Sequence, residues 1–446
     1  MNKTLESDIS AHGATMELKK HILVDGFEMV VDVSRSQGSR FYDAAHDREF
    51  IDMYSFYASM PIGFNHPHFD LPEVREDLLD AAVTKVANSD VYTVQYARFV
   101  QTFARVVGVP QLDRFFFIEG GALAVENALK AAMDWKVQKN IAAGRGEIGT
   151  EVLHFQNAFH GRTGYTMSLT NTDPNKVRHF AKFDWPRVST PAIEFELPEP
   201  QRTERAIADE RQAEAEILAA IQARPHRICS IIIEPVQGEG GDRHFRKEWF
   251  QTLRRICNQH EMILIFDEVQ CGMGLTGRNW CFQHFDVLPD VVCFGKKAQV
   301  CGIMASSARF DEVPENVFRK SSRINSTWGG NLTDMVRSTH CLNIIEREHL
   351  VDNARIMGER FLAQLQNLAA EEPVITGVRG RGLMLAFSLP NAEVRNQFWK
   401  ACWDAGLLVI RCGERSIRLR PVLDVKPDII GDVTAKMRET LRKITK

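Results

Sequence analysis

Glycines and residues with charged or amide side chains follow five apolar runs of this chain, each at the point where the run ends. The runs are residues 114–118, 152–156, 228–233, 262–266 and 291–294. The segments that follow them are Glu119-Gly120-Gly121-Ala122, Phe159-His160-Gly161-Arg162, Glu234-Pro235 with Gln237-Gly238-Glu239-Gly240, Asp267-Glu268-Val269-Gln270, and Gly295-Lys296-Lys297. In open α/β sheets, ligands bind beyond the carboxyl ends of the strands. We therefore expect the five segments to build one site.

The first segment has the composition of a phosphate-binding turn. Gly120 and Gly121 precede a helical pattern, and glycines there let a phosphate approach the backbone N–H groups and the positive end of a helix. A simple tight turn would explain the same residues. No Walker-type Gly-Lys-Ser/Thr follows, which argues against a nucleoside triphosphate. A nominal GxGxxG at residues 144–149 lies after a helix and before a strand, the reverse of a dinucleotide-binding motif.

Two charged residues stand at the ends of other strands. Asp267 follows four apolar residues, so its carboxylate is expected to be buried and to need a partner, either a protonated heteroaromatic nitrogen or a structural arginine. Lys296 could be a solvated strand-end lysine. In a partly apolar pocket, however, a lysine has a lowered pKa and attacks carbonyl groups. A phosphate loop, a buried aspartate and a strand-end lysine together indicate a site for pyridoxal phosphate.

Other classes of function find little support. His66 and His68 lack further residues at metal-ligand spacing, and the chain has no HExxH and no GxSxG. A formal net charge of −3 without a dense basic cluster argues against nucleic acid as a partner. The nine cysteines form no CxxC pair, which favours a reducing compartment. With no signal-peptide segment and no apolar run near the roughly 20 residues of a membrane helix, we expect a cytoplasmic protein and no membrane partner.

The elements that must position these residues alternate along the chain. Short apolar strands alternate with helical patterns at residues 71–86, 96–107 and 204–223, which is typical of a parallel sheet covered on both faces. We predict an α/β fold with a large doubly wound domain, its sheet mostly parallel, over residues 66–335.

The two ends of the chain are predicted to form a second, smaller α/β domain. Residues 1–65 would be an N-terminal arm of that domain and residues 336–446 its main part. The predicted elements are strands at 27–33, 48–53, 381–387 and 416–419 and a closing helix at 429–444.

At these residues the chain resembles the class III aminotransferases, fold-type I pyridoxal-phosphate enzymes that act on ornithine, 4-aminobutyrate or lysine. The likeness runs from about Asp25 to Pro421. It rests on Phe-His-Gly-Arg, Glu-Pro-x-Gln-Gly-Glu, Asp-Glu-Val-Gln and the strand-end lysine together. Segments 119–130, 294–297 and 325–331 are most similar to members that act on lysine. Many members have a hydroxyl residue beside the phosphate-loop glycine, where this chain has Ala122, so backbone N–H groups would bind more of the phosphate.

The resemblance implies a role for each cofactor-site residue. Lys296 would be the Schiff-base lysine and later a proton shuttle; it matches the family lysine, rather than Lys297, in its distance from Pro289-Asp290. Asp267 would keep the pyridinium nitrogen protonated. The other implied contacts are Gly121 and Ala122 at the phosphate, Phe159 and Val269 on the two ring faces, His160 beside Phe159, Gln270 at the ring hydroxyl, and Thr327 of the partner subunit completing the phosphate cradle of an obligatory homodimer.

The resemblance also implies how two substrates share one pocket. Arg162 would bind the distal carboxylate, and Arg418 would bind the α-carboxylate of glutamate. Glu239 would neutralise Arg418 while lysine is bound and swing aside for glutamate, because an unpaired guanidinium near the methylene chain is costly. Asn325 would also belong to the substrate site. A structural role for Arg418, as a strand arginine, stays open.

The implied reaction is transfer of the ε-amino group of L-lysine to 2-oxoglutarate in a ping-pong cycle. It would give 2-aminoadipate 6-semialdehyde and glutamate. The same chemistry on 4-aminobutyrate or ornithine is the alternative, because the sequence does not show the length of the pocket. A non-catalytic ligand-binding protein of the same fold is the alternative from another class, and the presence of both Lys296 and Asp267 argues against it.

Overall fold

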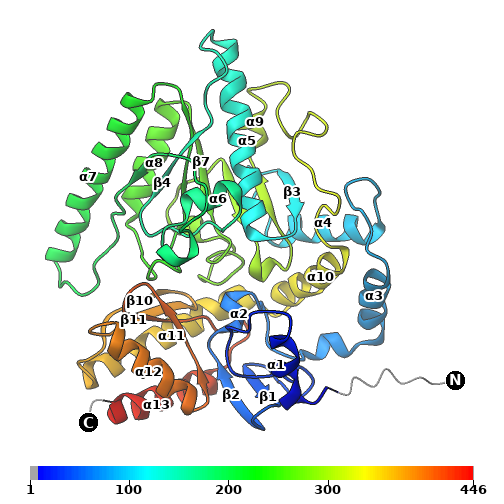
Figure 1. Cartoon of the computed structure of the whole chain (residues 1–446), viewed down its shortest axis with the longest axis vertical. Helices are drawn as coiled ribbons and strands as arrows, with labels where there is room; N and C mark the ends of the chain where they lie inside the picture. Colours follow the sequence, from blue (N-terminus) through cyan, green and yellow to red (C-terminus); the bar gives the residue numbers. More distant parts are fainter. Residues whose placement is uncertain (1–8, 445–446) are drawn as a thin grey trace.

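The structure is a computed structural model of the chain and describes residues 9–444. The first eight residues of the predicted arm and the last two of the predicted small domain lie outside the described residues. Figure 1 shows a large α/β part above a second part that is built from both ends of the chain. The helix that follows Gly120, α5, belongs to the large part.

The strands are β1 (Arg40–Asp43), β2 (Arg48–Asp52), β3 (Arg114–Ile118), β4 (Glu151–Phe155), β5 (Arg187–Val188), β6 (Ile228–Ile233), β7 (Ile263–Asp267), β8 (Val291–Phe294), β9 (Cys301–Ala305), β10 (Thr376–Arg381), β11 (Met384–Ser388), β12 (Leu407–Leu408), β13 (Ile410–Cys412) and β14 (Ser416–Leu419). The helices are α1 (Ala11–Lys19), α2 (Ser55–Ala58), α3 (Pro72–Val83), α4 (Val94–Val106), α5 (Gly121–Ala142), α6 (Gly164–Leu169), α7 (Gln201–Ala223), α8 (Lys247–Gln259), α9 (Ser307–Phe310), α10 (Leu332–Arg347), α11 (Leu350–Glu371), α12 (Ala392–Asp404) and α13 (Pro427–Ile444). Short 3-10 turns are η1 (Pro67–Asp70), η2 (Pro174–Lys176), η3 (Cys281–His284) and η4 (Lys296–Ala298).

The large sheet has seven strands in the order β3-β9-β8-β7-β6-β4-β5. Strands β5, β4, β6, β7 and β8 pair in parallel, whereas β9 is antiparallel to both of its neighbours. The mostly parallel sheet and the α/β class are as predicted. Strand β9 was not predicted, because the sequence directly after Lys296-Lys297 carries only a short, glycine-containing apolar run.

Alternate residues of the central strands pack on opposite faces of this sheet. In β7, Ile263 and Ile265 belong to the cluster that includes Leu129 and Trp135 of α5, whereas Leu264 and Phe266 belong to the cluster that includes Leu253 of α8. The period-2 alternation of a strand produces this division. Burial on both faces explains why these strands were visible as continuous apolar runs.

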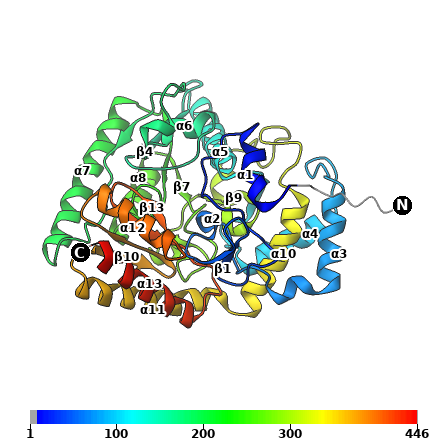
Figure 2. The same cartoon turned by 60° about the horizontal axis from the view of Figure 1, so that its bottom comes forward.

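The second part contains two smaller sheets. In the first, β2 pairs antiparallel with β1 and parallel with β12, so the N-terminal strands lie beside C-terminal elements, as Figure 2 also shows. In the second, β10-β11-β14-β13 are all antiparallel. The proposed domain boundary at residue 335 falls inside α10, which packs against α3 and α4.

Two strand predictions differ from the structure. The predicted strand 27–33 is not a strand, and only Val31 forms an isolated bridge. The predicted strand 381–387 is the turn and second strand of the β10–β11 hairpin. At that turn Gly382 has φ +51°, and a Cβ there would lie 2.5 Å from the backbone of Thr276, so the turn requires glycine.

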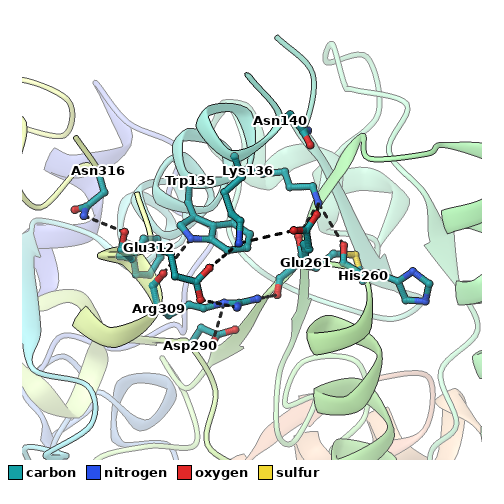
Figure 3. A network of polar contacts seen from close by, with 12 residues as sticks. Trp135, Lys136, Asn140, His260, Glu261, Asp290, Arg309, Glu312 and Asn316 are labelled. Carbon is teal, nitrogen blue, oxygen red and sulfur yellow. Dashed lines mark hydrogen bonds and ion pairs between the residues drawn. The ribbon is translucent and has the colours of Figure 1, made fainter. Parts of the chain in front are cut away.

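The nominal GxGxxG forms a turn between the end of α5 and the start of β4. Asn140 donates to the carbonyls of Ile148 and His226 at 2.7 and 2.9 Å. Buried Lys136 donates to the carbonyl of Glu261 at 2.7 Å, and a Cβ on Gly149 would lie 2.6 Å from its Cγ. Figure 3 shows Lys136 and Asn140 near the C-terminal end of α5, with Lys136 bonded to His260 and Glu261. These glycines therefore shape a structural turn.

None of the helices within residues 9–444 is long and apolar enough to cross a membrane. Over the same range, no group of three or more His, Cys, Asp or Glu side chains could hold a metal ion.

Candidate active site

The segments at the strand ends converge on one cavity of about 610 Å³. It is lined by Ser59, Gly121, Ala122, Phe159, His160, Gly161, Arg162, Glu234, Glu239, Asp267, Val269, Gln270, Lys296, Gln299 and Cys301. Ten of the predicted site residues are in this set. The cavity lies where the carboxyl ends of parallel strands meet the start of α5, as expected for an open α/β sheet.

The floor of the cavity has the shape of an anion cradle. Gly120 has φ +100° and precedes α5 without a side-chain cap. No side chain of the cap residue therefore occupies the first N–H groups of the helix, which can donate to a ligand. A Cβ on Gly121 would lie 3.1 Å from Val269. A Cβ on Gly161 would collide with the methyl group of Ala122. Small residues thus bring backbone N–H groups to the cavity surface, where they suit a phosphate.

Asp267, at the end of β7, is 5% exposed and lines the cavity. Its Oδ2 lies 2.7 Å from His160 Nδ1, and its Oδ1 accepts the N–H of Val269 at 3.1 Å. The partner that the buried carboxylate needs is therefore a histidine, and no arginine pairs with it in the described part of the chain. A carboxylate accepts about four hydrogen bonds, so Asp267 retains acceptor capacity for a protonated ring nitrogen.

Lys296 follows β8 and lines the cavity. Its φ of 49° is left-handed, a strained conformation that concentrates at functional sites. Burial, and then the nearby Arg418 and Arg420, lower the pKa of Lys296 to about 8, although Asp267 and Glu234 act in the opposite direction. A lysine of this kind is partly neutral near neutral pH and can act as a nucleophile or base.

Lys297 points away from the cavity. It is 2% exposed, and its Nζ donates to the carbonyl of Met60 at 2.8 Å. Burial lowers the pKa of Lys297 to about 7. Of the two lysines, Lys296 is the one whose amine can reach a molecule in the cavity.

Gln270 accepts hydrogen bonds from two arginines, Arg418 in β14 and Arg420 directly after it. Arg418 Nη1 and Arg420 Nη2 donate to Gln270 Oε1 at 3.1 and 3.2 Å. Because both partners are donors, the atom that they face is the amide oxygen. The amide nitrogen is then the group of Gln270 that remains for another acceptor, such as a ring hydroxyl.

The two arginines differ in their partners. Arg420 is fully buried and pairs with the equally buried Asp242, which is a structural role. Arg418 is also buried, yet no carboxylate between residues 9 and 444 forms an ion pair with it, and its Nε has no hydrogen-bond partner there. The guanidinium lies 5.7 Å from the ring of Tyr57. Arg418 does not line the cavity itself and adjoins it through Gln270; an unpaired guanidinium can bind a carboxylate.

Arg162 and Glu239 complete the charged groups of the cavity. Arg162 is exposed and forms no ion pair or hydrogen bond with the rest of the described chain. Glu239 does not contact Arg418, the partner implied for it. Its Oε1 accepts the hydroxyl of Thr172 at 2.8 Å and pairs with Lys176, so its cationic partner in the structure is Lys176.

Asn325 and Thr327 are exposed and do not line the cavity of their own chain. Their loop packs on residues 88–89, where Asn88 donates to the carbonyl of Gly330 at 3.0 Å and Ser89 Oγ donates to the carbonyl of Ser326.

The sequence did not identify several residues of the site. Glu234 accepts the N–H of Phe159 at 2.9 Å, and burial, reinforced by Asp267, raises its pKa. Its Glu-Pro motif was visible, but nothing in it indicated a contact with Phe159. Ser59 and Gln299 meet at the cavity edge, where Gln299 donates to the carbonyl of Ser59 at 2.8 Å.

Tyr57, which lies beside Arg418 rather than in the lining of the cavity, sits on an unusual turn. Residues 55–58 all have positive φ although none is glycine, and no sequence pattern predicts such a turn. Asp52 caps it by accepting the N–H groups of Tyr54 and Ser55 at 2.7 and 2.8 Å. Ser55 Oγ donates to the carbonyl of Arg420 at 2.6 Å, so the turn is tied to the strand that carries Arg418.

An α/β sheet with an anion cradle, a buried carboxylate and a reactive lysine at its strand ends defines a pyridoxal-phosphate-dependent enzyme. These groups fit the cofactor: α5 for its phosphate, Asp267 for its ring nitrogen and Lys296 for its aldehyde. The family model described as aminotransferase class III matches residues 24–441. The chain belongs to the class III aminotransferases.

Similar proteins cover nearly the whole chain. It is 49% identical to the L-lysine-epsilon aminotransferase of Mycobacterium tuberculosis, over 96% of this chain and 95% of that protein. It is 47% identical to the L-lysine-epsilon aminotransferase of Streptomyces clavuligerus, over 94% and 92%. Among solved structures, the lysine aminotransferase from M. tuberculosis in the internal aldimine form matches with a TM-score of 0.95 and 48% identity, over 98% of this chain and 100% of that chain.

Proposed function

We propose that the protein transfers the ε-amino group of L-lysine to 2-oxoglutarate, giving 2-aminoadipate 6-semialdehyde and glutamate. The observation that carries the choice of lysine is the near-full-length similarity to lysine-epsilon aminotransferases, at 46–49% identity. The cavity contributes a reactive amine, a buried carboxylate and the guanidinium of Arg162. Arg418, which has no acidic partner among residues 9–444, is hydrogen-bonded to the cavity residue Gln270.

When bound, pyridoxal phosphate supplies an aldehyde that accepts the amino group and a ring that withdraws electrons from the carbon that loses its proton. The N–H groups of Gly121 and Ala122 would bind the phosphate, and Asp267 would keep the proton on the ring nitrogen. Lys296, with its lowered pKa, can take up a proton at Nζ and return it to a neighbouring carbon.

Arg162 and Arg418 would bind the carboxylates of the two substrates. Arg162 would take the α-carboxylate of lysine or the γ-carboxylate of glutamate, and Arg418 would take the α-carboxylate of glutamate. When lysine is bound, its uncharged methylene chain would lie near Arg418, and Glu239 would then supply the missing negative charge.

A homodimer with shared active sites belongs to the same proposal. Thr327 and Asn325 are exposed and lie outside the cavity of their own chain, as expected if Thr327 of the partner subunit completes the phosphate cradle. The cytoplasmic location and a role in lysine catabolism stay predictions.

The test is a single turnover of the purified holoenzyme with L-lysine in the absence of 2-oxoglutarate, followed by the absorbance of the cofactor. Ornithine and 4-aminobutyrate are run in parallel, and the semialdehyde is trapped with an aromatic amine. We expect rapid loss of the cofactor absorbance with lysine. A response to only one of the other amines would refute the choice of substrate.

A further inference from the structure

The carboxylate of Glu239 is held by two residues of one neighbouring segment. Oε1 accepts the Thr172 hydroxyl at 2.8 Å and forms an ion pair with Lys176. The two charged side chains are only 33% and 22% exposed for Lys176 and Glu239. Lys176 belongs to η2, and its Nζ also lies 5.5 Å from the ring of Phe159. The pair is therefore a partly buried contact beside the cofactor cavity.

Glu239 lies at the boundary between two cavities. It lines the cavity that contains Lys296 and also a second cavity of about 920 Å³. Lys176 and Thr172 line only the second cavity. Tyr57 lines this second cavity as well, and its ring lies 5.7 Å from the guanidinium of Arg418. Glu239 thus borders both cavities, and its carboxylate pairs with a lysine on the side of the second one.

Arg418 is the cation without a carboxylate partner in this arrangement. Its Nη1 donates to Gln270 and its buried Nε has no acceptor among residues 9–444. In the structure Glu239 pairs with Lys176, and Arg418 has no carboxylate partner among residues 9–444. Any interaction that stabilises the pair with Lys176 therefore keeps Arg418 available for a substrate carboxylate.

We propose that Lys176 is a positioning residue that competes with Arg418 for the carboxylate of Glu239 and so sets the balance between the two half-reactions. This inference rests on the proposed function, in which Glu239 pairs with Arg418 while lysine is bound. With Lys176 present, Glu239 is not paired with Arg418, and Arg418 can bind a carboxylate of a dicarboxylate substrate. Without Lys176, Glu239 pairs with Arg418 and a dicarboxylate must first displace it, whereas lysine meets an already neutralised arginine.

The test compares Lys176→Met with the wild-type holoenzyme in both half-reactions. Partly exposed ion pairs stabilise by an amount that corresponds to about a fivefold change in an equilibrium constant. We expect KM for 2-oxoglutarate and Kd for glutarate, measured by calorimetry, to rise about fivefold. KM for L-lysine should stay unchanged or fall. Lys176→Arg should restore wild-type values.

A double-mutant cycle with Glu239→Gln separates this effect from direct attraction between Lys176 and a dianion. If Lys176 acts through Glu239, Lys176→Met should change glutarate binding in the wild-type background but not in the Glu239→Gln background. Lys400→Met is the matched control: Lys400 lines the same second cavity but pairs with Asp404. It should leave both half-reactions unchanged.

The inference is overturned if Lys176→Met changes both half-reactions by the same factor, if it changes neither, or if its effect on glutarate persists in the Glu239→Gln background. Failure of the proposed function is a different result: the wild-type enzyme would not react with L-lysine. The glutarate cycle would still report whether Lys176 controls Glu239.

Discussion

The Asp267→Asn substitution separates the charge of this residue from its shape. Asparagine can keep the contacts of Asp267 with His160 at 2.7 Å and with the N–H of Val269 at 3.1 Å, so the fold is expected to survive. What it loses is the negative charge at a site that is only 5% exposed. Removing one member of a buried charge pair costs about 3–5 kcal/mol. If that charge holds the proton of the cofactor ring, the rate falls by roughly 150- to 5,000-fold.

The assay is the rate constant of the half-reaction with L-lysine in a stopped-flow spectrophotometer. Glu268→Gln is the matched control, because Glu268 is the next residue and is equally buried, but does not line the cavity. Its oxygens accept the N–H groups of Cys281 and Phe282 at 2.6 and 2.7 Å. Burial raises the pKa of Glu268 to about 8, so glutamine keeps the neutral charge that prevails at neutral pH, although its amide nitrogen cannot accept the second N–H group.

We expect Glu268→Gln to stay within a few-fold of the wild-type rate. The reasoning is refuted if Asp267→Asn, with the cofactor bound and an unchanged melting temperature, remains within tenfold of the wild type. It is also refuted if Glu268→Gln slows the reaction as much as Asp267→Asn does.

Three further predictions concern Lys296, Lys297 and the subunit interface. Because the pKa of Lys296 is about 8, its amine is protonated below that pH; reconstitution of the apoenzyme with pyridoxal phosphate should quicken with rising pH and level off above about pH 8. A rate that keeps rising to pH 10 would mean that the lysine is not perturbed. Lys297→Met should lower the free energy of unfolding in urea by about 1–3 kcal/mol, because the carbonyl of Met60 loses its buried donor; an unchanged midpoint would contradict this. Mixing and refolding Lys296→Ala with Thr327→Ala subunits, each inactive alone, should restore activity, because one site of the mixed dimer would then have both residues intact. No restoration would mean that Thr327 serves its own chain.

The strands that form the site were predictable because they are buried on both faces. β3, β6 and β8 begin and end where the apolar runs do, and the polar ends of the parallel strands meet because these strands share one edge of the large sheet. The lining of the cavity follows from this topology, which is why ten of the predicted residues are found in it.

The remaining features depend on contacts between distant segments. The left-handed turn at residues 55–58 is stabilised by Asp52 and by the link from Ser55 to Arg420, which no local pattern encodes. Likewise the partner of Glu239 is Lys176, 63 residues earlier in the chain. Propensity and periodicity describe neighbours in sequence, so they indicate neither of these contacts.

The most direct test of the central claim is to follow the nitrogen itself. The holoenzyme is incubated with 2-oxoglutarate and with L-lysine that carries ¹⁵N at either its ε- or its α-amino group, and the glutamate formed is analysed by mass spectrometry. We predict ¹⁵N-glutamate from the ε-labelled lysine alone. Label arriving from the α-amino group, or unlabelled glutamate from both substrates, would contradict the account.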